Sequence, residues 1–219
     1  MSTMDFAKAR ENMVEQQVRP WDVLDIRVLD ALSQLPREDF VPPAYRALAY
    51  ADVPLPIGHG QLMLKPVVEG RMLQALAVQP TDEVLEIGTG SGYATACLGR
   101  LARDVVSIEL LPGLAEEARA RLEALALGGN VRIAVADALQ YQPGRQFDLV
   151  CVSAAVDTIP RHFLSLLRPG GRMFVVRGRA PAMAAVLVRN DAGGPRIESL
   201  FETELPYLVG AEPTPEFHL

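Results

Sequence analysis

The 219-residue sequence predicts an α/β fold, in which a doubly wound, mostly parallel sheet ends in an antiparallel C-terminal hairpin. Between residues 83 and 176, short apolar runs alternate with segments of helical periodicity. This alternation is typical of βαβ units, which place helices on both faces of a parallel sheet. After residue 185, two further apolar runs flank the turn Asp191-Ala-Gly-Gly-Pro195, which predicts a hairpin at the sheet edge.

The N-terminal third predicts helices and loops rather than strands. Residues 5–34 carry apolar side chains at helical spacing and read as two helical pieces. We expect the break at Arg19-Pro20, because the residue before a proline disfavours the α conformation. Residues 36–60 are rich in proline and glycine, which excludes long regular elements and is typical of a functional loop. Helical periodicity returns over residues 66–76.

The sheet follows. The predicted strands are Glu83–Ile87, Val105–Ile108, Val131–Val135, Asp148–Ser153, Gly171–Val176, Ala185–Asn190 and Ile197–Leu205. Helices are predicted from the glycines after residue 87 through Leu101, and over Pro112–Leu127 and Pro160–Leu167. We expect one domain over residues 1–219, with a helical cover and loop in 1–76, the α/β core in 77–205 and a tail in 206–219 that shows no periodic pattern.

Composition excludes several classes of protein. The 21 basic and 27 acidic residues give a formal charge of −6, whereas nonspecific nucleic-acid binding needs a basic surface. Cys97 and Cys151 have neither disulfide-framework nor metal-ligand spacing. Residues 1–10 lack the apolar region of a signal peptide, and no apolar run approaches the ~20 residues that span a bilayer. We therefore expect a cytoplasmic protein without nucleic-acid, membrane or metal partners; the oligomeric state stays open.

A glycine-rich loop, Gly88-Thr-Gly90-Ser-Gly92, follows the first predicted parallel strand and precedes a helix. Ligands bind at this place in open parallel sheets. A dinucleotide fingerprint would carry its third glycine where this chain has Tyr93. Glu86, two residues before the loop, would repel a pyrophosphate and attract a cationic amine. Both residues disfavour a nicotinamide-dependent oxidoreductase.

Two more acidic residues end neighbouring strands. Glu109 lies about 20 residues after Gly88, the spacing of an acid that binds ribose hydroxyls, and Asp137 follows the third strand. Carboxylates at three successive strand ends suit a nucleoside with a positively charged amino-acid tail, S-adenosylmethionine. The predicted cofactor-binding residues are Glu86, Gly88, Thr89, Gly90, Ser91, Gly92, Glu109, Leu110, Asp137, Ala138 and Ser153.

Five sequence blocks resemble the protein-L-isoaspartate O-methyltransferases: Glu11–Pro20, Pro36–Pro42, Pro56–Gln61, Leu85–Tyr93 and Ser153–Pro160. The glycine block fits any class I methyltransferase, whereas the N-terminal blocks are more specific. The resemblance runs from about residue 12 to residue 176. It implies a Rossmann-like, seven-stranded methyltransferase sheet with an added N-terminal helical cover. It also implies methyl transfer from S-adenosylmethionine to isoaspartyl carboxylates of damaged proteins or peptides, which starts their repair.

The chain departs from this family pattern in two places. The family's Gln-Thr-Ile-Ser-Gln-Pro is here Gln61-Leu-Met-Leu-Lys-Pro66, so its active-site serine falls on Leu64 and its threonine on Leu62. The family's Gly-Asp-Gly after the third strand is here Ala136-Asp137-Ala138. The first change leaves two alternatives open: a same-fold methyltransferase with a changed substrate, or a catalytically silent member that binds the cofactor.

Methyl transfer to a carboxylate is an in-line displacement that needs no general base, because a carboxyl group with a pKa near ~4 is already ionised at neutral pH. The site has to align the reacting atoms and exclude water. Leu64 cannot donate the hydrogen bond of a serine. Lys65 is a candidate replacement, and His59 and Gln61 are further candidates in the same loop. No catalytic residue is assigned from the sequence.

Overall fold

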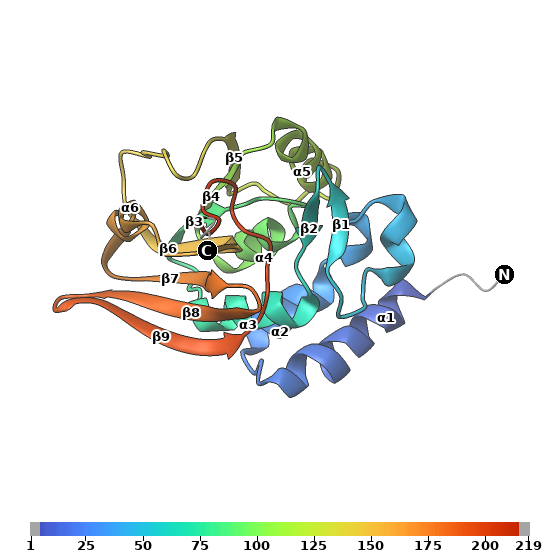
Figure 1. Ribbon diagram of the computed structural model, residues 1–219. Coiled ribbons are helices and arrows are strands. Elements are labelled where there is room, and N and C mark those ends of the chain that lie inside the picture. The colour runs from blue at the N-terminus through green and yellow to red at the C-terminus, as the bar shows by residue number, and fades with distance from the viewer. Residues whose placement is uncertain (1–4, 215–219) are drawn as a thin grey trace, which may run out of the picture.

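A computed structural model describes residues 5–214 and contains a seven-stranded sheet. Helices cover both of its faces (Figure 1). Its strand order is β5-β4-β3-β6-β7-β8-β9. The strands are β3 (Glu83–Ile87), β4 (Asp104–Glu109), β5 (Val131–Val135), β6 (Phe147–Val156), β7 (Leu167–Arg179), β8 (Ala182–Asp191) and β9 (Gly194–Glu202). The pairings among β3 to β7 are parallel, and β8 and β9 add antiparallel ones. The predicted fold class is therefore confirmed.

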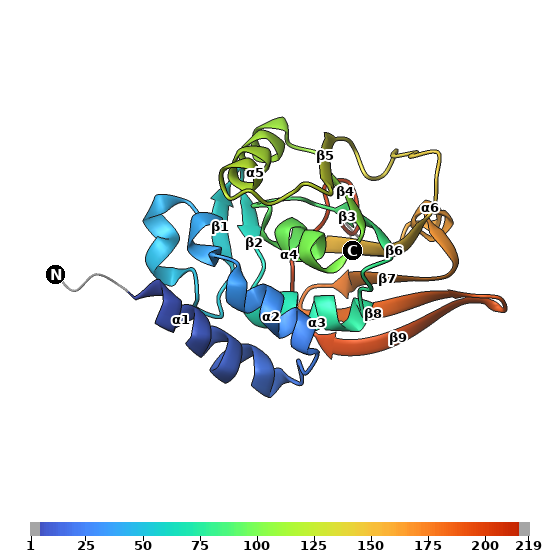
Figure 2. The same ribbon diagram turned by 180° about the vertical axis from the view of Figure 1, so that it is seen from behind.

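The strand order reverses between β3 and β6, which creates a crevice at the carboxyl ends of these strands. On one side of this point, α4 (Tyr93–Leu101) and α5 (Pro112–Ala124) connect β3, β4 and β5. On the other side, the short α6 (Arg161–Ser165) connects β6 to β7. Because such crossovers are right-handed, these two sets of helices cover opposite faces of the sheet. Figure 2 shows α4 on the same face as the N-terminal helices.

Alternate residues of the strands feed two separate cores. Along β6, Leu149 and Cys151 pack into the core beneath α3 and α4, whereas Val150 and Val152 pack into the core beneath α6. All four side chains are fully buried. This period of two explains why the parallel strands read as nearly continuous apolar runs in the sequence.

The helical cover, residues 5–34, stays helical longer than predicted. After α1 (Phe6–Asn12) come a π-helical stretch (Met13–Val18) and a 3-10 turn (Arg19–Trp21), and the break falls at Asp22, whose φ is 62°. The predicted break at Arg19-Pro20 is therefore wrong. Pro20 lies in the first positions of the 3-10 turn, where its missing N–H disrupts no hydrogen bond. The second piece is α2 (Ile26–Gln34).

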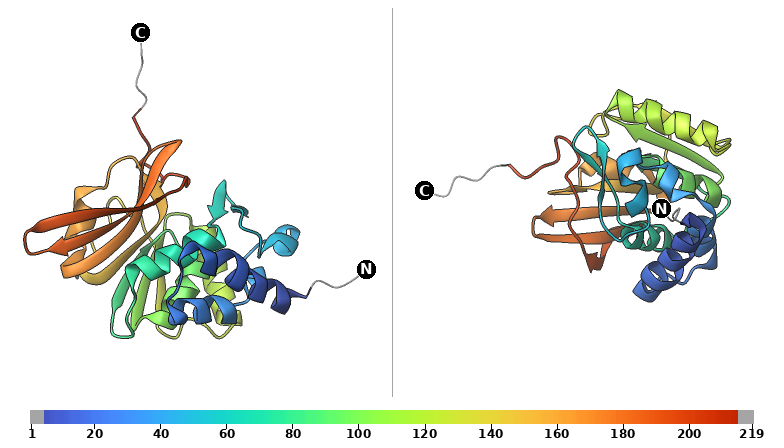
Figure 3. Two further views of the ribbon diagram at one scale, coloured as in Figure 1. Left: turned by 90° about the horizontal axis from the view of Figure 1, so that it is seen from below. Right: turned by 90° about the vertical axis from the view of Figure 1, so that its right-hand side faces the viewer.

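Between the cover and the sheet lie 3-10 turns (Arg37–Asp39 and Pro43–Leu48), a small hairpin and α3 (Pro66–Leu76). The hairpin pairs β1 (Leu55–Gly58) with β2 (Gln61–Met63) and stands apart from the main sheet. Long regular elements were excluded here from the sequence, but this hairpin was not predicted. In the view from below, the helical cover and strands β8 and β9 lie toward opposite sides of the molecule (Figure 3).

The C-terminal tail was unassigned from the sequence; its residues 206–214 fold back over the sheet, and residues 215–219 lie outside the described part. Ala155 donates a hydrogen bond to the carbonyl of Pro206, and Leu208 donates one to the carbonyl of Ala155. The Tyr207 hydroxyl donates to the carbonyl of Gly178 at 3.0 Å. The tail thereby reaches the carboxyl end of β6. Within residues 5–214, no helix has the length and apolar character needed to cross a membrane.

At Gly70, α3 packs tightly against the cover. A methyl group added there would lie 2.6 Å from Val18 Cγ1 and 3.3 Å from Val23 Cγ2. Helix propensity alone would favour Gly70→Ala by about 1 kcal/mol. Because both valines are fully buried, we expect overpacking to prevail, with a net loss of about 1–2 kcal/mol in the free energy of unfolding.

Urea denaturation of Gly70→Ala measures this loss, with Gly129→Ala as the control. A methyl group at the exposed Gly129 meets nothing within 4 Å, so its effect should stay within about 0.5 kcal/mol. A Gly70→Ala protein as stable as wild type would show that the cover is not held at this contact.

Candidate cofactor and active site

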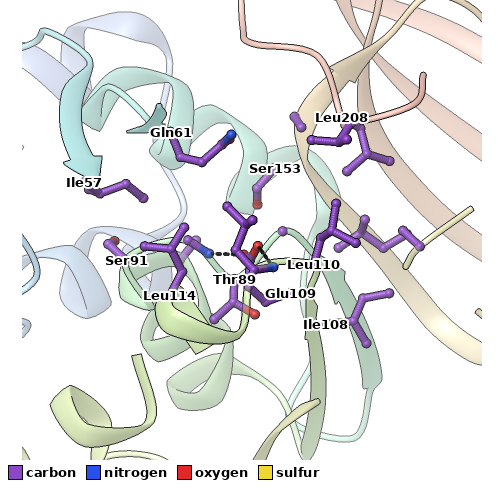
Figure 4. Close-up of a pocket in the computed structure, with 18 of the residues that line it drawn as sticks. Ile57, Gln61, Thr89, Ser91, Ile108, Glu109, Leu110, Leu114, Ser153 and Leu208 are labelled. Atoms are coloured by element: carbon purple, nitrogen blue, oxygen red, sulfur yellow. Dashed lines mark hydrogen bonds between the residues drawn. The ribbon is translucent and has the colours of Figure 1, made fainter. Parts of the chain in front are cut away.

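A cavity opens at the carboxyl ends of the parallel strands, where the strand order reverses. The glycine loop, the ends of β4 and β6, hairpin β1–β2 and the C-terminal tail supply its walls (Figure 4). Nine of the predicted cofactor residues line it: Gly88, Thr89, Gly90, Ser91, Glu109, Leu110, Asp137, Ala138 and Ser153. The other two, Glu86 and Gly92, are buried and are not among the lining residues.

The three glycines give the loop its shape. Gly88, Gly90 and Gly92 have φ values of 91°, 52° and 88°, which side-chain-bearing residues rarely adopt. A Cβ on Gly90 would lie 3.2 Å from Ile57 Cδ1, so the hairpin packs directly on the loop. The loop therefore depends on glycine both for its backbone conformation and for this contact.

Glu109 is fixed at the end of β4 and lies next to the loop. Its Oε2 accepts a hydrogen bond from the backbone N–H of Gly90 at 2.9 Å, and its Oε1 accepts one from Leu111 at 3.1 Å (Figure 4). The residue is 7% exposed and lines the cavity. A carboxylate offers about four lone-pair sites, so both oxygens can still accept hydrogen bonds from ligand hydroxyls.

Glu86 is fully buried, and it supports the loop from below. Its Oε2 accepts hydrogen bonds from Thr95 of α4 and Ser107 of β4, and the Ser107 hydroxyl also lies 2.6 Å from that of Thr89. Burial raises the pKa of Glu86 to about 7, against the opposing hydrogen bonds. Glu86 is not among the residues that line the cavity, and its predicted contact with an amine stays a prediction.

A buried ion pair that was not predicted from the sequence contributes one residue, Glu69, to the cavity wall. Arg37 of the 3-10 turn Arg37–Asp39 pairs with Glu69 of α3, and the two side chains are 0% and 2% exposed. Arg37 also donates to the carbonyls of Ala49 and Leu64, and its guanidinium lies 4.7 Å from the ring centroid of Tyr93. Burial raises the pKa of Glu69 to about 7, and Arg37 opposes that rise.

Asp137 and its neighbours form the end of the cavity that follows β5. Asp137 accepts hydrogen bonds from the N–H of Leu139 and from the amide of Gln140, so it shapes its own turn. Ala138 is buried there, and Leu110 stands 38% exposed at the mouth. This end therefore combines apolar surface with a fixed carboxylate.

Hairpin β1–β2 supplies the opposite end. Gln61, Leu62 and Leu64 line the cavity, whereas His59 and Lys65 do not. His59 lies at the hairpin tip with φ 53°, and a Cβ on Gly113 of α5 would be 3.1 Å from its Nε2. His59 thus packs against the start of α5. Lys65 is half-buried at the N-terminus of α3.

Sequence reasoning missed the contribution of the tail, since Tyr207, Leu208 and Val209 also line the cavity. Their segment has no periodicity, and only the three prolines at 206, 213 and 215 marked it. Glu69 was missed because it lies within a helical pattern that predicts no function. Among the described residues, no group of three His, Cys, Asp or Glu side chains is placed to hold a metal ion.

The sheet topology, the glycine loop and the acid at the end of the second parallel strand define an S-adenosylmethionine-dependent methyltransferase. Comparison with known families agrees. The model of the protein-L-isoaspartate(D-aspartate) O-methyltransferase family (PCMT) matches residues 8–204, and the chain belongs to this family.

Relatives and solved structures are consistent with this assignment. A protein-L-isoaspartate O-methyltransferase of Methylorubrum extorquens is 43% identical over 89% of this chain and 85% of its own length. One from Rhodopseudomonas palustris is 39% identical over 94% of this chain and 85% of its own. A Plasmodium falciparum structure described as this enzyme, in complex with S-adenosyl-L-homocysteine, matches the fold with a TM-score of 0.80 at 18% identity, covering 94% of this chain and 99% of its own.

Because the pKa of Glu86 is raised in the folded protein, its burial should affect the free energy of unfolding in a pH-dependent way. Its pKa is about 7 in the folded chain and 4.5 ordinarily, so its contribution to stability falls as pH rises through this interval. Glu86→Gln removes this titration. We expect the melting temperature of the variant, relative to wild type, to increase between pH 5 and pH 8.

Thermal unfolding by circular dichroism over this pH range checks the expectation. Glu116→Gln, at an exposed position of α5, is the matched control and should show no such trend. A constant difference between Glu86→Gln and wild type at all pH values would mean that Glu86 does not titrate in this range.

Proposed function

We propose that this protein transfers the methyl group of S-adenosylmethionine to the carboxylate of isoaspartyl residues in damaged proteins or peptides. The observation that supports this most directly is that two sets of residues line one and the same cavity. One set is the glycine loop with Glu109, and the other is the wall of hairpin β1–β2 and the tail. Membership of the family supplies the substrate class.

In this proposal, the cofactor lies along the carboxyl ends of β5, β4 and β3. Glu109 binds the ribose hydroxyls, because its carboxylate is fixed by two backbone N–H groups and still has free lone pairs. Leu110, Asp137 and Ala138 surround the adenine. Gly88, Gly90 and Ser91 let the backbone approach the methionyl part closely.

Hairpin β1–β2 and the tail hold the acceptor. An isoaspartyl carboxylate is ionised at neutral pH, so the protein has to orient it and exclude water rather than remove a proton. Leu62, Leu64 and Val209 provide an apolar wall, and Gln61 offers an amide donor beside it. We propose that Gln61 orients the acceptor carboxylate in place of the hydroxyl that Leu64 lacks.

A second candidate function is methyl transfer to a different acceptor on the same scaffold. The observation that favours it is the pair of leucines in the cavity, at positions where the family resemblance places a threonine and a serine. An apolar wall stabilises an uncharged acceptor better than a carboxylate, because it cannot replace the hydrogen bonds that a carboxylate loses on leaving water.

We propose that the protein acts in the cytoplasm. Cys97 and Cys151 are both buried as free thiols, which agrees with a reducing compartment. The remaining partners in this proposal are proteins and peptides that carry isoaspartyl residues.

Methyl transfer from radiolabelled S-adenosylmethionine, scored as base-labile methanol, tests the acceptor. Wild type should methylate an isoaspartyl peptide and leave the matching aspartyl peptide unmodified. Leu64→Ser should raise the rate on the isoaspartyl peptide by on the order of ten-fold, because a hydroxyl donor reaches the acceptor oxygen. Activity that appears only in Leu64→Ser would support the changed acceptor, and activity in neither would refute the isoaspartyl assignment.

The role of Glu109 is tested by binding. Glu109→Ala should weaken the affinity for S-adenosylhomocysteine by about 10–100-fold, since two charge-assisted hydrogen bonds to the ribose are lost. Isothermal titration calorimetry measures the change, and Glu116→Gln should bind like wild type. An undiminished affinity of Glu109→Ala would exclude the ribose contact.

A further inference from the structure

Glu69 is a buried carboxylate that faces the cavity with one oxygen unused. It lines the cavity although its side chain is only 2% exposed. Arg37 binds its Oε2, and among residues 5–214 no hydrogen bond is made to its Oε1. An oxygen of a cavity-lining carboxylate that accepts no hydrogen bond from the protein can accept one from a ligand, so this atom is a candidate for binding a ligand.

The other carboxylates near the cavity differ in this respect. Both oxygens of Glu109 accept backbone N–H groups, and both oxygens of Asp137 accept hydrogen bonds within their own turn. Glu86 Oε1 is buried without a partner, but it lies outside the cavity lining, so among the lining carboxylates of residues 5–214 Glu69 is the one with an oxygen that accepts no hydrogen bond.

Glu69 also lies at a defined place along the sheet edge. Asp137 follows β5 and Glu109 ends β4, whereas α3, which carries Glu69, packs against β6 and β7. In the strand order, β5 and β4 lie on one side of β3 and its glycine loop, and β6 and β7 lie on the other side. A ligand with its adenosine over β5 and β4 and its thioether near the loop would extend its amino-acid tail toward Glu69.

We propose that Glu69, fixed by Arg37, binds the α-ammonium group of the methionyl tail of the cofactor. The assignment goes beyond the proposed function and names a recognition residue for one charged group of the ligand. Arg37 and Glu69 form a pair without net charge. The α-ammonium group is a second cation, and it can donate a hydrogen bond to the Glu69 oxygen that Arg37 leaves free. Such charge-assisted hydrogen bonds are about twice as strong as neutral ones. The raised pKa of Glu69 agrees with a carboxylate that one arginine does not fully compensate.

Three ligands isolate this contact in binding experiments. S-adenosylhomocysteine carries the whole tail, its deaminated analogue lacks only the α-ammonium group, and 5′-methylthioadenosine lacks the amino-acid tail altogether. We expect wild type to bind S-adenosylhomocysteine at least about ten-fold more tightly than the deaminated analogue. In Glu69→Gln this preference should fall to within about three-fold.

Glu69→Gln leaves Arg37 buried without a counter-charge, which endangers folding. The double variant Arg37→Met/Glu69→Leu removes both charges and should show the same loss of preference. Affinity for 5′-methylthioadenosine reports whether each variant retains its nucleoside site, and it should stay within about three-fold of wild type. Glu116→Gln, at an exposed position of α5, is the matched control and should keep the preference.

The proposal would be overturned if Glu69→Gln or the double variant still bound S-adenosylhomocysteine ten-fold or more tightly than the deaminated analogue. It would also be overturned if wild type bound these two ligands equally well. If wild type bound neither S-adenosylhomocysteine nor 5′-methylthioadenosine, the cofactor assignment would fail together with it. If wild type bound 5′-methylthioadenosine well but bound S-adenosylhomocysteine and its deaminated analogue weakly, the nucleoside site would stand and only the role of Glu69 would be refuted.

Discussion

The buried guanidinium of Arg37 holds together the parts of the molecule that form the acceptor half of the cavity. It binds the carbonyls of Ala49 and Leu64, pairs with Glu69 and lies over the ring of Tyr93. These partners belong to the loop after the cover, the end of hairpin β1–β2, α3 and α4. A planar group with five donors in fixed directions suits such a junction, and lysine could not satisfy all of them. Because both charges are buried, removing one partner would leave the other uncompensated.

The cofactor half is organised by a different set of carboxylates. Glu86 binds Thr95 and Ser107 below the glycine loop, and Glu109 binds the Gly90 N–H above it. The loop is thus held between two acids before any ligand arrives. Preorganisation of this kind reduces the conformational entropy that a ligand would otherwise have to overcome. The acidic spacing in the sequence therefore reflects loop support as well as ligand contact.

The features that were predictable from the sequence are those encoded by local patterns. The period-two strands, the glycine loop and Glu109 are local patterns, so the sheet and most of the cofactor wall followed from the sequence. The contribution of Tyr207 depends on a backbone bridge to Ala155, more than fifty residues earlier, which no local pattern encodes. The pairing of Arg37 with Glu69 likewise joins two segments through the fold. The helical break was misplaced because Arg19 keeps the α conformation before Pro20, at the end of a stretch that buries Met13, Val14 and Val18.

This division has a consequence for how the acceptor is selected. The cofactor wall is built largely from backbone groups and side chains of one continuous βαβ region, whereas the acceptor wall combines hairpin β1–β2 with the tail after β9. Leu62, Leu64 and Val209 take no part in the hydrogen bonds that Glu86 and Glu109 make around the glycine loop. Replacing a hydroxyl by an alkyl group at Leu64 therefore changes how an acceptor carboxylate is solvated, while the atoms that hold the glycine loop stay where they are.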